Sequence, residues 1–408
     1  MTFELQPESA AGERLIHAAQ QLVPTFADRA SAADASNQVC RANFYDLVAS
    51  RITSAFVPED LGGLGLRSIY DWIALITTLA RGDASTAIAI NMHLGVSRGM
   101  VMAYEQAAPG SKGQQSLEPQ LRQLVSGEML ICATATETGT DNLHPLTEAV
   151  RSADGWNISG RKIFVTLSPI ATHLGMNLRM RDETGDHLVS TMVPIQVDGL
   201  QPQDDWDALG MRSSGSQSVV FDQVQVPLAS IRKIGPWGQW SVPMLMNRAL
   251  ANLPLVGAFL GIAEAAHSLA LAQLAKQKRL GAPAHSHAGV QHLVGEIDIE
   301  LAKCQATLGA AARSMDRFMA DHATRKPTIE AAHHLMRDYQ AAKWVVNRGA
   351  IDIVSKAMDL FGGAGYTNRH PLARLYRDVR AGPFMQPFAP TEARQYVGQV
   401  ALRQWPEQ

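Results

Sequence analysis

The segment RDVRAGPFMQPFAPTEA, residues 377–393, carries polar side chains that could do chemistry, with Gln386 at its centre. A primary amide donates and accepts hydrogen bonds, but it has no basic site near neutral pH. Gln386 is therefore suited to orienting a substrate, and proton abstraction would need a carboxylate of tuned pKa. The same segment offers two carboxylates, Asp378 and Glu392.

Each of these two carboxylates also has a structural interpretation. Asp378 lies between Arg377 and Arg380, so we expect a structural ion pair there. Glu392 stands in the sequence PTEA, which is typical of a helix start, and an acidic side chain is favoured in the first turn of a helix. We therefore prefer a structural role for both residues over that of a catalytic base.

Histidine and cysteine, the usual metal ligands, show no metal-binding spacing. The 13 histidines form no His-x-x-x-His pattern, and His333 and His334 are adjacent, so they cannot share a helix face. The 3 cysteines, Cys40, Cys132 and Cys304, are far apart and form no Cys-x-x-Cys pair. We expect no metal site, and the unpaired cysteines fit a reducing cytoplasm.

Composition excludes several other classes of protein. The chain has 408 residues, of which 46% are hydrophobic and 18% charged, with a net charge of -2, and no basic tract that would suit nucleic acid. The most apolar stretch, residues 253–263, is shorter than the roughly 20 residues that a membrane span needs, so we expect a buried helix and no membrane association. No G-x-G-x-x-G or P-loop motif occurs, so a nicotinamide site is not evident.

The pattern of elements changes twice along the chain. Residues 1–125 show helical periodicity, for example at 68–83 and 84–107. Residues 126–235 contain short runs typical of strands, at 155–168, 187–197 and 218–227. Residues 236–408 return to helix. The predicted fold class is therefore α+β, with an N-terminal helical domain, a middle β domain and a C-terminal four-helix bundle.

Two long apolar seams predict the bundle. In the first, apolar side chains recur at alternating intervals of four and three residues from Val290 to Phe318, with Cys304 on the same face. In the second, the pattern repeats from Leu335 to Ile353. Helices with such faces bury them against one another, so Cys304 is expected to be a core thiol.

Four segments together resemble the acyl-CoA dehydrogenase superfamily. They are VPEDLGGLGL (57–66), ICATATETGTD (131–141), GMRSSGSQSVVFDQVQVP (210–227) and LFGGAGYTNRHPLARLYRDVR (360–380). The resemblance spans nearly the whole chain and implies the superfamily's three-domain fold, bound FAD and a homodimer or homotetramer. The superfamily also includes flavin monooxygenases.

The resemblance implies a set of cofactor-binding residues in the middle domain: Ile131, Ala133, Thr134, Thr140, Phe164 and Thr166. Phe164 matches the position that stacks on the flavin, and Thr166 matches a residue near its reactive nitrogen. Thr134 and Thr140 match residues that contact flavin or substrate, because hydroxyls supply donors to the ring carbonyls. Ordinary strand packing is the alternative for each of them.

A second set of cofactor-binding residues is implied in the bundle. Arg279 is the nearest match to an arginine that reaches the FAD pyrophosphate, and Gln291 fits a glutamine downstream of it. Gly362 and Gly363 fit a glycine pair that lets the backbone approach the cofactor of a second subunit. The glycine pair also suits the turn that ends a helix.

Counting from Arg377, the catalytic glutamate of the dehydrogenases falls on Gln386, and its neighbouring glycine falls on Pro387. That glutamate removes the proton alpha to a thioester carbonyl. Some members carry it instead on the first helix of the bundle, where this chain offers Arg248 or Asn252, which we expect to face the substrate. Neither place supplies a carboxylate.

Three functions remain open. The first, slightly favoured, is a dehydrogenase-type two-electron oxidation of an acyl-thioester-like or related small molecule, with an electron-transfer flavoprotein as partner. Its base has moved, with Glu392 as a candidate, or its substrate needs no base. The second is a monooxygenase that uses O2 and reduced FAD or FMN from a flavin reductase. In it His93 would face the flavin as a catalytic residue, although a hydrogen-bonded core histidine is about equally expected. The third is a flavin-binding protein without catalysis.

Overall fold

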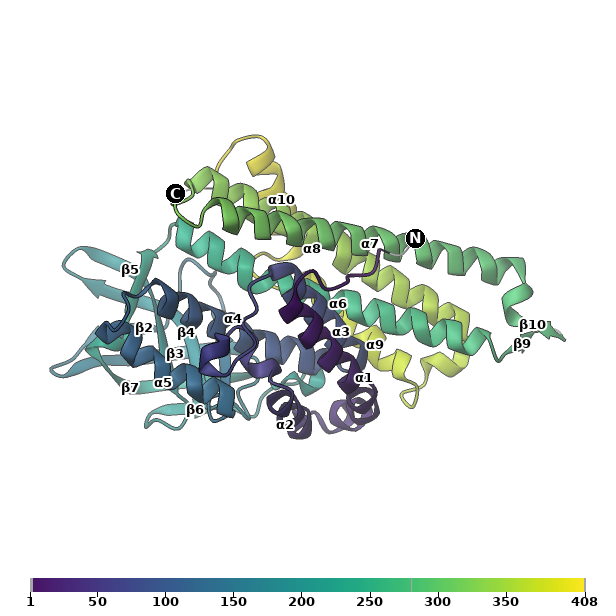
Figure 1. Cartoon of the computed structure of the whole chain (residues 1–408), viewed down its shortest axis with the longest axis horizontal. Coiled ribbons are helices and arrows are strands. Elements are labelled where there is room, and N and C mark those ends of the chain that lie inside the picture. The colour runs from purple at the N-terminus through teal and green to yellow at the C-terminus, as the bar shows by residue number, and fades with distance from the viewer. Residues whose placement is uncertain (1–2, 280, 407–408) are drawn as a thin grey trace.

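The computed structural model describes residues 3–279 and 281–406. Figure 1 shows a sheet at one end of the molecule and long helices that run from it to the other end. The first part of the chain forms α1 (Ala10–Ser36), α2 (Arg41–Ala49), α3 (Ile69–Gly82), α4 (Ala84–Gln106) and α5 (Lys112–Ser126). Short 3-10 turns join elements throughout: η1 (Ile52–Ser54), η2 (Glu59–Leu61), η3 (Arg212–Ser214), η4 (Leu228–Ser230), η5 (Ala284–Ser286), η6 (Gly362–Tyr366) and η7 (Val379–Phe384).

The two helices expected at 68–83 and 84–107 are confirmed as α3 and α4. The Ser68 side chain caps α3 by accepting a hydrogen bond from the Asp71 backbone N–H. The Asp83 side chain, which accepts from the N–H groups of Ser85 and Thr86, caps α4. Nearly every residue of α3 is buried, so this helix is the core of the N-terminal part and carries α1 on one side and α6 on another.

The middle part is a sheet of eight strands: β1 (Ile131–Thr134), β2 (Glu148–Arg151), β3 (Gly155–Val165), β4 (His173–Asp182), β5 (Gly185–Pro194), β6 (Leu200–Pro202), β7 (Gln217–Pro227) and β8 (Arg232–Pro236). Their order is β6-β7-β3-β2-β4-β5-β8, and β1 pairs in parallel with β4. The three strand regions expected from the sequence correspond to β3, β5 and β7. Strand β4 was not predicted, although Leu174, Met176, Leu178 and Met180 alternate along it and are buried.

The last part contains three long helices, α6 (Val242–Leu274), α7 (Ala288–Asp321) and α8 (Ile329–Phe361), and two shorter ones, α9 (Pro371–Asp378) and α10 (Pro390–Ala401). A small hairpin, β9 (Lys278–Arg279) and β10 (Ala282–Pro283), joins α6 to α7 at the end of the molecule away from the sheet (Figure 1). The predicted apolar seams are the buried faces of α7 and α8, and Cys304 is fully buried.

Helix α6 is apolar over most of its length. In the part of the chain that the structure describes, it is the one helix whose length and composition would allow a membrane span. However, 67% of its most apolar window is buried inside the protein, where it packs against α3 and α8. It is therefore the core helix that the sequence predicted around residues 253–263.

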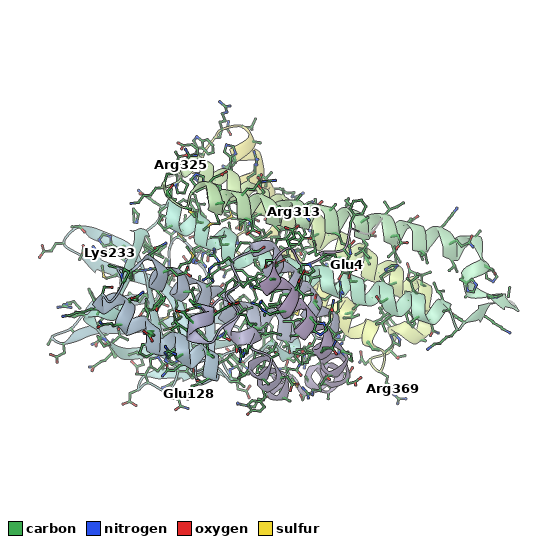
Figure 2. The ribbon with its side chains drawn as sticks, in the orientation of Figure 1. Glu4, Glu128, Lys233, Arg313, Arg325 and Arg369 are labelled. Atoms are coloured by element: carbon green, nitrogen blue, oxygen red, sulfur yellow. The ribbon has the colours of Figure 1, made fainter. Side chains whose placement is uncertain are left out.

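Ion pairs tie the N-terminal segment to the helices. Arg81 of α3 binds Glu4 at 2.5 Å and the buried Glu264 of α6 at 2.7 Å. Arg313 of α7 binds Glu8 at 2.7 Å, and Figure 2 shows Arg313 on the same side of the bundle as Glu4. These contacts hold the start of the chain across α3 and the bundle.

Candidate active site

Gln386 lies where the C-terminal segment meets the sheet. Its amide Nε2 donates a hydrogen bond to the Thr136 hydroxyl, in the loop that follows β1. Next to it, the Asn142 amide donates to the Pro387 carbonyl at 3.3 Å. The segment that the sequence singled out is therefore brought against the 131–141 segment, which also carries the family resemblance.

A buried ion pair fixes the loop that bears Thr136. The Glu137 carboxylate binds the Lys162 ammonium of β3 at 2.5 Å and accepts from the N–H groups of Leu146 and Thr147 at 2.6 and 3.1 Å. Burial lowers the pKa of Lys162 to about 8, and Glu137 opposes this shift. The Glu137 carboxylate thus connects the start of the loop to β3 and to the far end of the loop at Leu146 and Thr147. This fixes the position of the neighbouring Thr136.

The other carboxylates near Gln386 in sequence or by contact also have partners. Glu392 accepts from the Ala389 N–H at 3.0 Å and so caps α10, which confirms the interpretation of the sequence PTEA. Asp141 binds the His144 ring Nδ1 at 2.9 Å. Together with Glu137, these groups are engaged in holding the backbone and loops, and none of them contacts Gln386.

The predicted ion pair of Asp378 with Arg377 and Arg380 is wrong in its partners. Asp378 is buried and accepts from the Met211 N–H at 2.6 Å, and its nearest cation is Arg374 at 3.9 Å. Arg377 instead binds Asp34 of α1. Burial raises the pKa of Asp378 to about 7, because the charged form is poorly solvated there.

Arg248 of α6 is a buried cation whose guanidinium is largely unpaired. It is 9% exposed, and its Nε and Nη2 are buried without a hydrogen-bond partner in the described part of the chain. Burial lowers the pKa of Arg248 to about 10, so the side chain stays charged at neutral pH. Its charge also acts on Lys162, and Asn252 donates to the Arg248 carbonyl at 2.7 Å.

Leaving a buried charge without a partner costs several kcal/mol, so native proteins rarely keep one without a use. Arg248 and Asn252, the two residues expected to face the substrate, are both buried and lie one turn apart on α6. The Arg248 guanidinium is therefore suited to bind a phosphate, carboxylate or carbonyl oxygen of a ligand.

The end of β3 is strained at Phe164. This residue has a positive φ of 54°, is 52% exposed, and contacts Trp206 edge-on with ring centroids 5.9 Å apart. The Thr166 hydroxyl lies beside it and shares a hydrogen bond of 2.8 Å with Ser216. Strained backbone with an exposed aromatic side chain is typical of a functional site. An aromatic face beside two hydroxyls fits the ring and the polar edge of a flavin.

The four predicted cofactor residues of the β1 region are less exposed than Phe164. They are Ile131, Ala133, Thr134 and Thr140. Thr134 donates its hydroxyl proton to the Ile163 carbonyl at 2.8 Å, and Thr140 donates to the His144 carbonyl at 2.5 Å. Ile131 is fully buried, and Ala133 pairs through its backbone with Thr166. Their contacts with a flavin stay predictions, since the hydroxyl protons of both threonines are engaged within the protein.

The predicted cofactor residues of the bundle are not brought to Gln386. Gly362 ends α8 with a φ of 66°, and Gly363 follows it in η6. Gln291 near the start of α7 donates to the His285 carbonyl at 3.1 Å. The role predicted for Arg279 concerns a side chain outside the described part of the structure. Gln291 thus follows the β9–β10 hairpin at the start of α7, and Gly362 and Gly363 lie where α8 ends.

His93 is a core residue of α4. It has no exposed surface, its Nε2 lies 2.8 Å from the Thr53 carbonyl, and its Nδ1 accepts from the Ile131 N–H at 3.1 Å. Burial lowers the pKa of His93 to about 4. Both ring nitrogens are therefore engaged by backbone groups, and the structure favours the core-histidine alternative over the catalytic role predicted for His93.

This environment predicts an acid-sensitive stability. Because the pKa of His93 is lower in the folded protein than its ordinary 6.5, the unfolded chain binds more protons between pH 6.5 and 4, and stability falls as the pH falls through this range. We expect His93 to account for about 2 kcal/mol of lost unfolding free energy between pH 7.5 and 5.

The measurement is urea unfolding of the wild type and His93→Asn at both pH values. The variant should be less stable at pH 7.5, lose about 2 kcal/mol less on acidification, and keep turnover within a few-fold. A turnover loss of 100-fold or more with unchanged stability would restore the catalytic role.

Sequence reasoning missed several residues of this site, among them Thr136, Glu137 and Lys162. Thr136 and Glu137 lie inside the segment that was compared with the superfamily, but the pairing of Glu137 with Lys162 is evident only in the structure. Lys162 is fully buried, which strand alternation alone does not distinguish from a solvent-facing lysine.

Comparisons with known proteins place the chain in a family. Two family models match, acyl-CoA dehydrogenase middle domain at residues 131–224 and acyl-CoA dehydrogenase C-terminal domain at residues 246–386. The amino sugar nitrososynthase DnmZ of Streptomyces peucetius is 34% identical over 400 residues, which cover 97% of this chain and 95% of that protein.

Solved structures support the same family assignment. KijD3 in complex with FMN and dTDP-3-amino-2,3,6-trideoxy-4-keto-3-methyl-D-glucose is 32% identical, has a TM-score of 0.91, and is covered over 97% of its length, with 100% of this chain matched. Butyryl-CoA dehydrogenase of Megasphaera elsdenii, 21% identical with a TM-score of 0.83 over 98% of this chain and 100% of that one, shares the fold.

The chain belongs to the acyl-CoA dehydrogenase superfamily, whose members are flavin-dependent oxidising enzymes. The predicted superfamily, the three-part helix–sheet–helix fold and the assignment to flavoprotein oxidoreductases are thereby confirmed.

Proposed function

We propose that the chain is a flavin-dependent N-oxygenase that oxidises the amino group of a nucleotide-linked amino sugar. Support comes from relatives that match the chain from end to end: DnmZ and L-evernosamine nitrososynthase are each 34% identical over 97% of this chain. The putative acyl-CoA dehydrogenase YdbM of Bacillus subtilis is 30% identical over 81% of it. The similarity thus favours the oxygenase alternative over the dehydrogenase that the sequence slightly favoured.

The observation that carries the proposal is the Gln386 amide, which is hydrogen-bonded to Thr136. The superfamily resemblance assigns to Gln386 the position where dehydrogenation would need a carboxylate. An amide cannot remove an alpha proton, but its carbonyl oxygen can accept a hydrogen bond from an amine N–H and so orient the nitrogen lone pair. N-Oxygenation needs this orientation and does not need a strong base. The engaged carboxylates Glu137 and Glu392 support the same conclusion.

The buried side chains of α6 support a polar substrate. A fatty acyl chain would leave the Arg248 guanidinium unpaired in an apolar environment, which is costly. A sugar nucleotide has phosphate, hydroxyl and carbonyl oxygens that can pair with it. Arg248 and Asn252 then serve to bind and orient the sugar nucleotide.

Phe164, Thr166 and Ser216 are the residues whose arrangement best fits the flavin. Phe164 would cover the ring face, and the two hydroxyls would bind its polar edge. When bound in its reduced form, FMN or FAD supplies two electrons and, with O2, the oxygen atom that is transferred. A separate flavin reductase is the partner that this chemistry requires.

The chain is further proposed to act as a homodimer or homotetramer. Tyr366, next to the Gly362–Gly363 turn, is 80% exposed, and Ile299 on α7 is 74% exposed. The superfamily resemblance supports this proposal, and a contact with a second copy at either side chain would bury apolar area.

The test is aerobic turnover of the purified protein with FMN or FAD, a flavin reductase, NADPH and a dTDP-linked 3-amino sugar, followed by mass analysis. Insertion of one oxygen gives a hydroxylamine, about 16 Da heavier, and a second oxidation with loss of water gives a nitroso sugar, about 14 Da heavier than the amine. No mass change, together with reduction of bound flavin by butyryl-CoA, would contradict the proposal and restore the dehydrogenase alternative.

A further inference from the structure

Side chains of α8 bind the backbone of the 382–388 segment, which contains Gln386, through hydrogen bonds. The Tyr339 hydroxyl donates to the Gln386 carbonyl at 2.5 Å. One turn further along the helix, the Lys343 ammonium donates to the Met385 carbonyl and, at 2.7 Å, to the Phe388 carbonyl. These bonds reach the backbone on both sides of the Gln386–Pro387 pair.

A third α8 side chain completes the row. Asn347 donates through Nδ2 to the Gly382 carbonyl at 2.7 Å, at the start of the segment. Tyr339, Lys343 and Asn347 are spaced four residues apart, so they lie one above the other on one face of α8. All three are almost completely buried, with Lys343 only 3% exposed.

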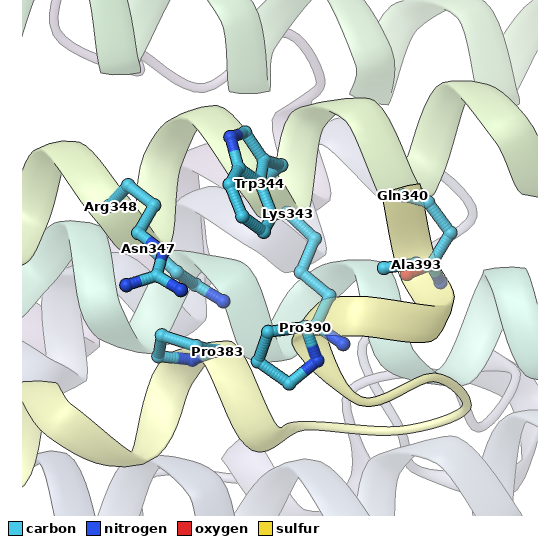
Figure 3. A pocket seen from close by; sticks show the side chains of 8 residues that line it. All are labelled: Gln340, Lys343, Trp344, Asn347, Arg348, Pro383, Pro390 and Ala393. Carbon is cyan, nitrogen blue, oxygen red and sulfur yellow. The ribbon is translucent and has the colours of Figure 1, made fainter. Parts of the chain in front are cut away.

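Lys343 differs from the other two because it is an amine that can carry a charge, and burial lowers its pKa to about 7. No carboxylate is within ion-pair distance of Lys343 in the described part of the chain, and Glu392, which interacts with it at longer range, caps α10. Figure 3 shows the side chain extending from α8 toward the loop, beside a small cavity lined by Trp344, Pro383 and Pro390. The Lys343 Nζ therefore makes its hydrogen bonds to backbone carbonyls and not to a carboxylate.

We propose that Lys343 is a positioning residue for the active site, whose ammonium draws together the carbonyls of Met385 and Phe388 and so fixes the direction in which Gln386 presents its amide. The inference rests on the proposed function for the role of Gln386. One amine nitrogen that donates to two carbonyls sets their separation. When the amine is protonated these bonds are strengthened, because charge-assisted hydrogen bonds are about twice as strong as neutral ones.

The activity test is a double-mutant cycle of Lys343→Met and Gln386→Ala. We expect Lys343→Met to lower kcat on the order of 10-fold with KM within about twofold, because a misplacement of about 1 Å can cost up to 100-fold. In the Gln386→Ala background the same change should cost less than about twofold, since the group that it positions is gone. Lys343→Arg, which keeps the charge and the donors, should recover part of the rate.

Lys356→Met is the matched control. Lys356 lies on the same helix and binds Asp352 and Glu296 at the surface, so its loss should leave kcat unchanged. Equal losses from Lys343→Met in the wild-type and Gln386→Ala backgrounds would show a general structural effect and overturn the inference.

A second measurement is independent of turnover. Amide hydrogen exchange of the 382–388 segment should quicken about 10-fold in Lys343→Met and stay unchanged in Lys356→Met, while flavin binding stays within about twofold in both. Unchanged exchange in Lys343→Met would overturn the positioning role. If the wild type fails to oxidise the amino sugar but the exchange result holds, the proposed function fails and the positioning of the segment stands.

Discussion

Replacing Arg248 by methionine is expected to lower kcat/KM for a nucleotide-linked amino sugar on the order of 100-fold while raising thermal stability. The two effects have one cause. Nε and Nη2 of the buried guanidinium have no partner within the described chain, so the folded protein bears the cost of an unpaired charge. A bound phosphate or carbonyl oxygen would offset that cost, and methionine removes both the cost and the binding energy.

Steady-state kinetics and thermal unfolding of the same preparation measure the two effects. Arg248→Lys keeps the charge but loses the two-pronged geometry, so it should fall between the wild type and Arg248→Met. Arg325→Met, at the exposed turn between α7 and α8 (Figure 2), controls for the loss of an arginine and should change neither quantity.

The opposite pattern would contradict this role. If Arg248→Met unfolds at a lower temperature and keeps its kcat/KM, then the guanidinium supports the packing of α6 and does not bind the substrate. A similar loss of kcat/KM for a free amino sugar without the nucleotide would indicate that Arg248 contacts the sugar and not the phosphates.

The sequence was informative wherever a residue's role follows from a local pattern. The apolar spacing along α7 and α8 predicted both helices and their buried faces, and the amide at position 386 raised the question of the missing base before any contact was known. Glu392 was correctly interpreted as an acidic residue at a helix start, because the sequence PTEA is typical of a first helical turn; its bond to the Ala389 N–H came only from the structure.

Contacts between distant segments could not be predicted in this way. The bond from Gln386 to Thr136 joins residues 250 positions apart, and Lys162 looks like an ordinary strand lysine until Glu137 is placed beside it. His93 shows the same limit, because the Thr53 and Ile131 backbone groups that bind its ring come from separate elements. Lys343 could have been singled out from the sequence, because it lies one turn from Tyr339 on the apolar face of the predicted helix, and a buried lysine is unusual.

Gln386→Glu is expected to slow oxidation of the amino sugar at pH 7 by roughly 10- to 100-fold and to move the pH profile to higher pH. Oxygen transfer to nitrogen needs the lone pair of the neutral amine. A carboxylate in place of the neutral amide would stabilise the ammonium form and raise the amine pKa by roughly 1 to 3 units. At a fixed pH the reactive fraction therefore falls, and it returns as the pH approaches the raised pKa.

The measurement is kcat/KM between about pH 6 and 9.5 for the wild type, Gln386→Glu and Gln386→Ala. Gln386→Ala should lose rate at every pH without a shift of the profile, because it removes orientation and adds no charge. The carboxylate should not create a dehydrogenase, since Pro387 stands where the resemblance places the superfamily's glycine and Lys343 holds the backbone on both sides. With reduced enzyme and a saturated acyl-CoA in deuterated buffer, we expect little or no alpha-proton exchange with the wild type, and at most weak exchange with Gln386→Glu. An unshifted profile in Gln386→Glu would mean that position 386 does not face the amine. Rapid deuterium uptake catalysed by the wild type would mean that a base lies elsewhere and that Gln386 does not set the chemistry.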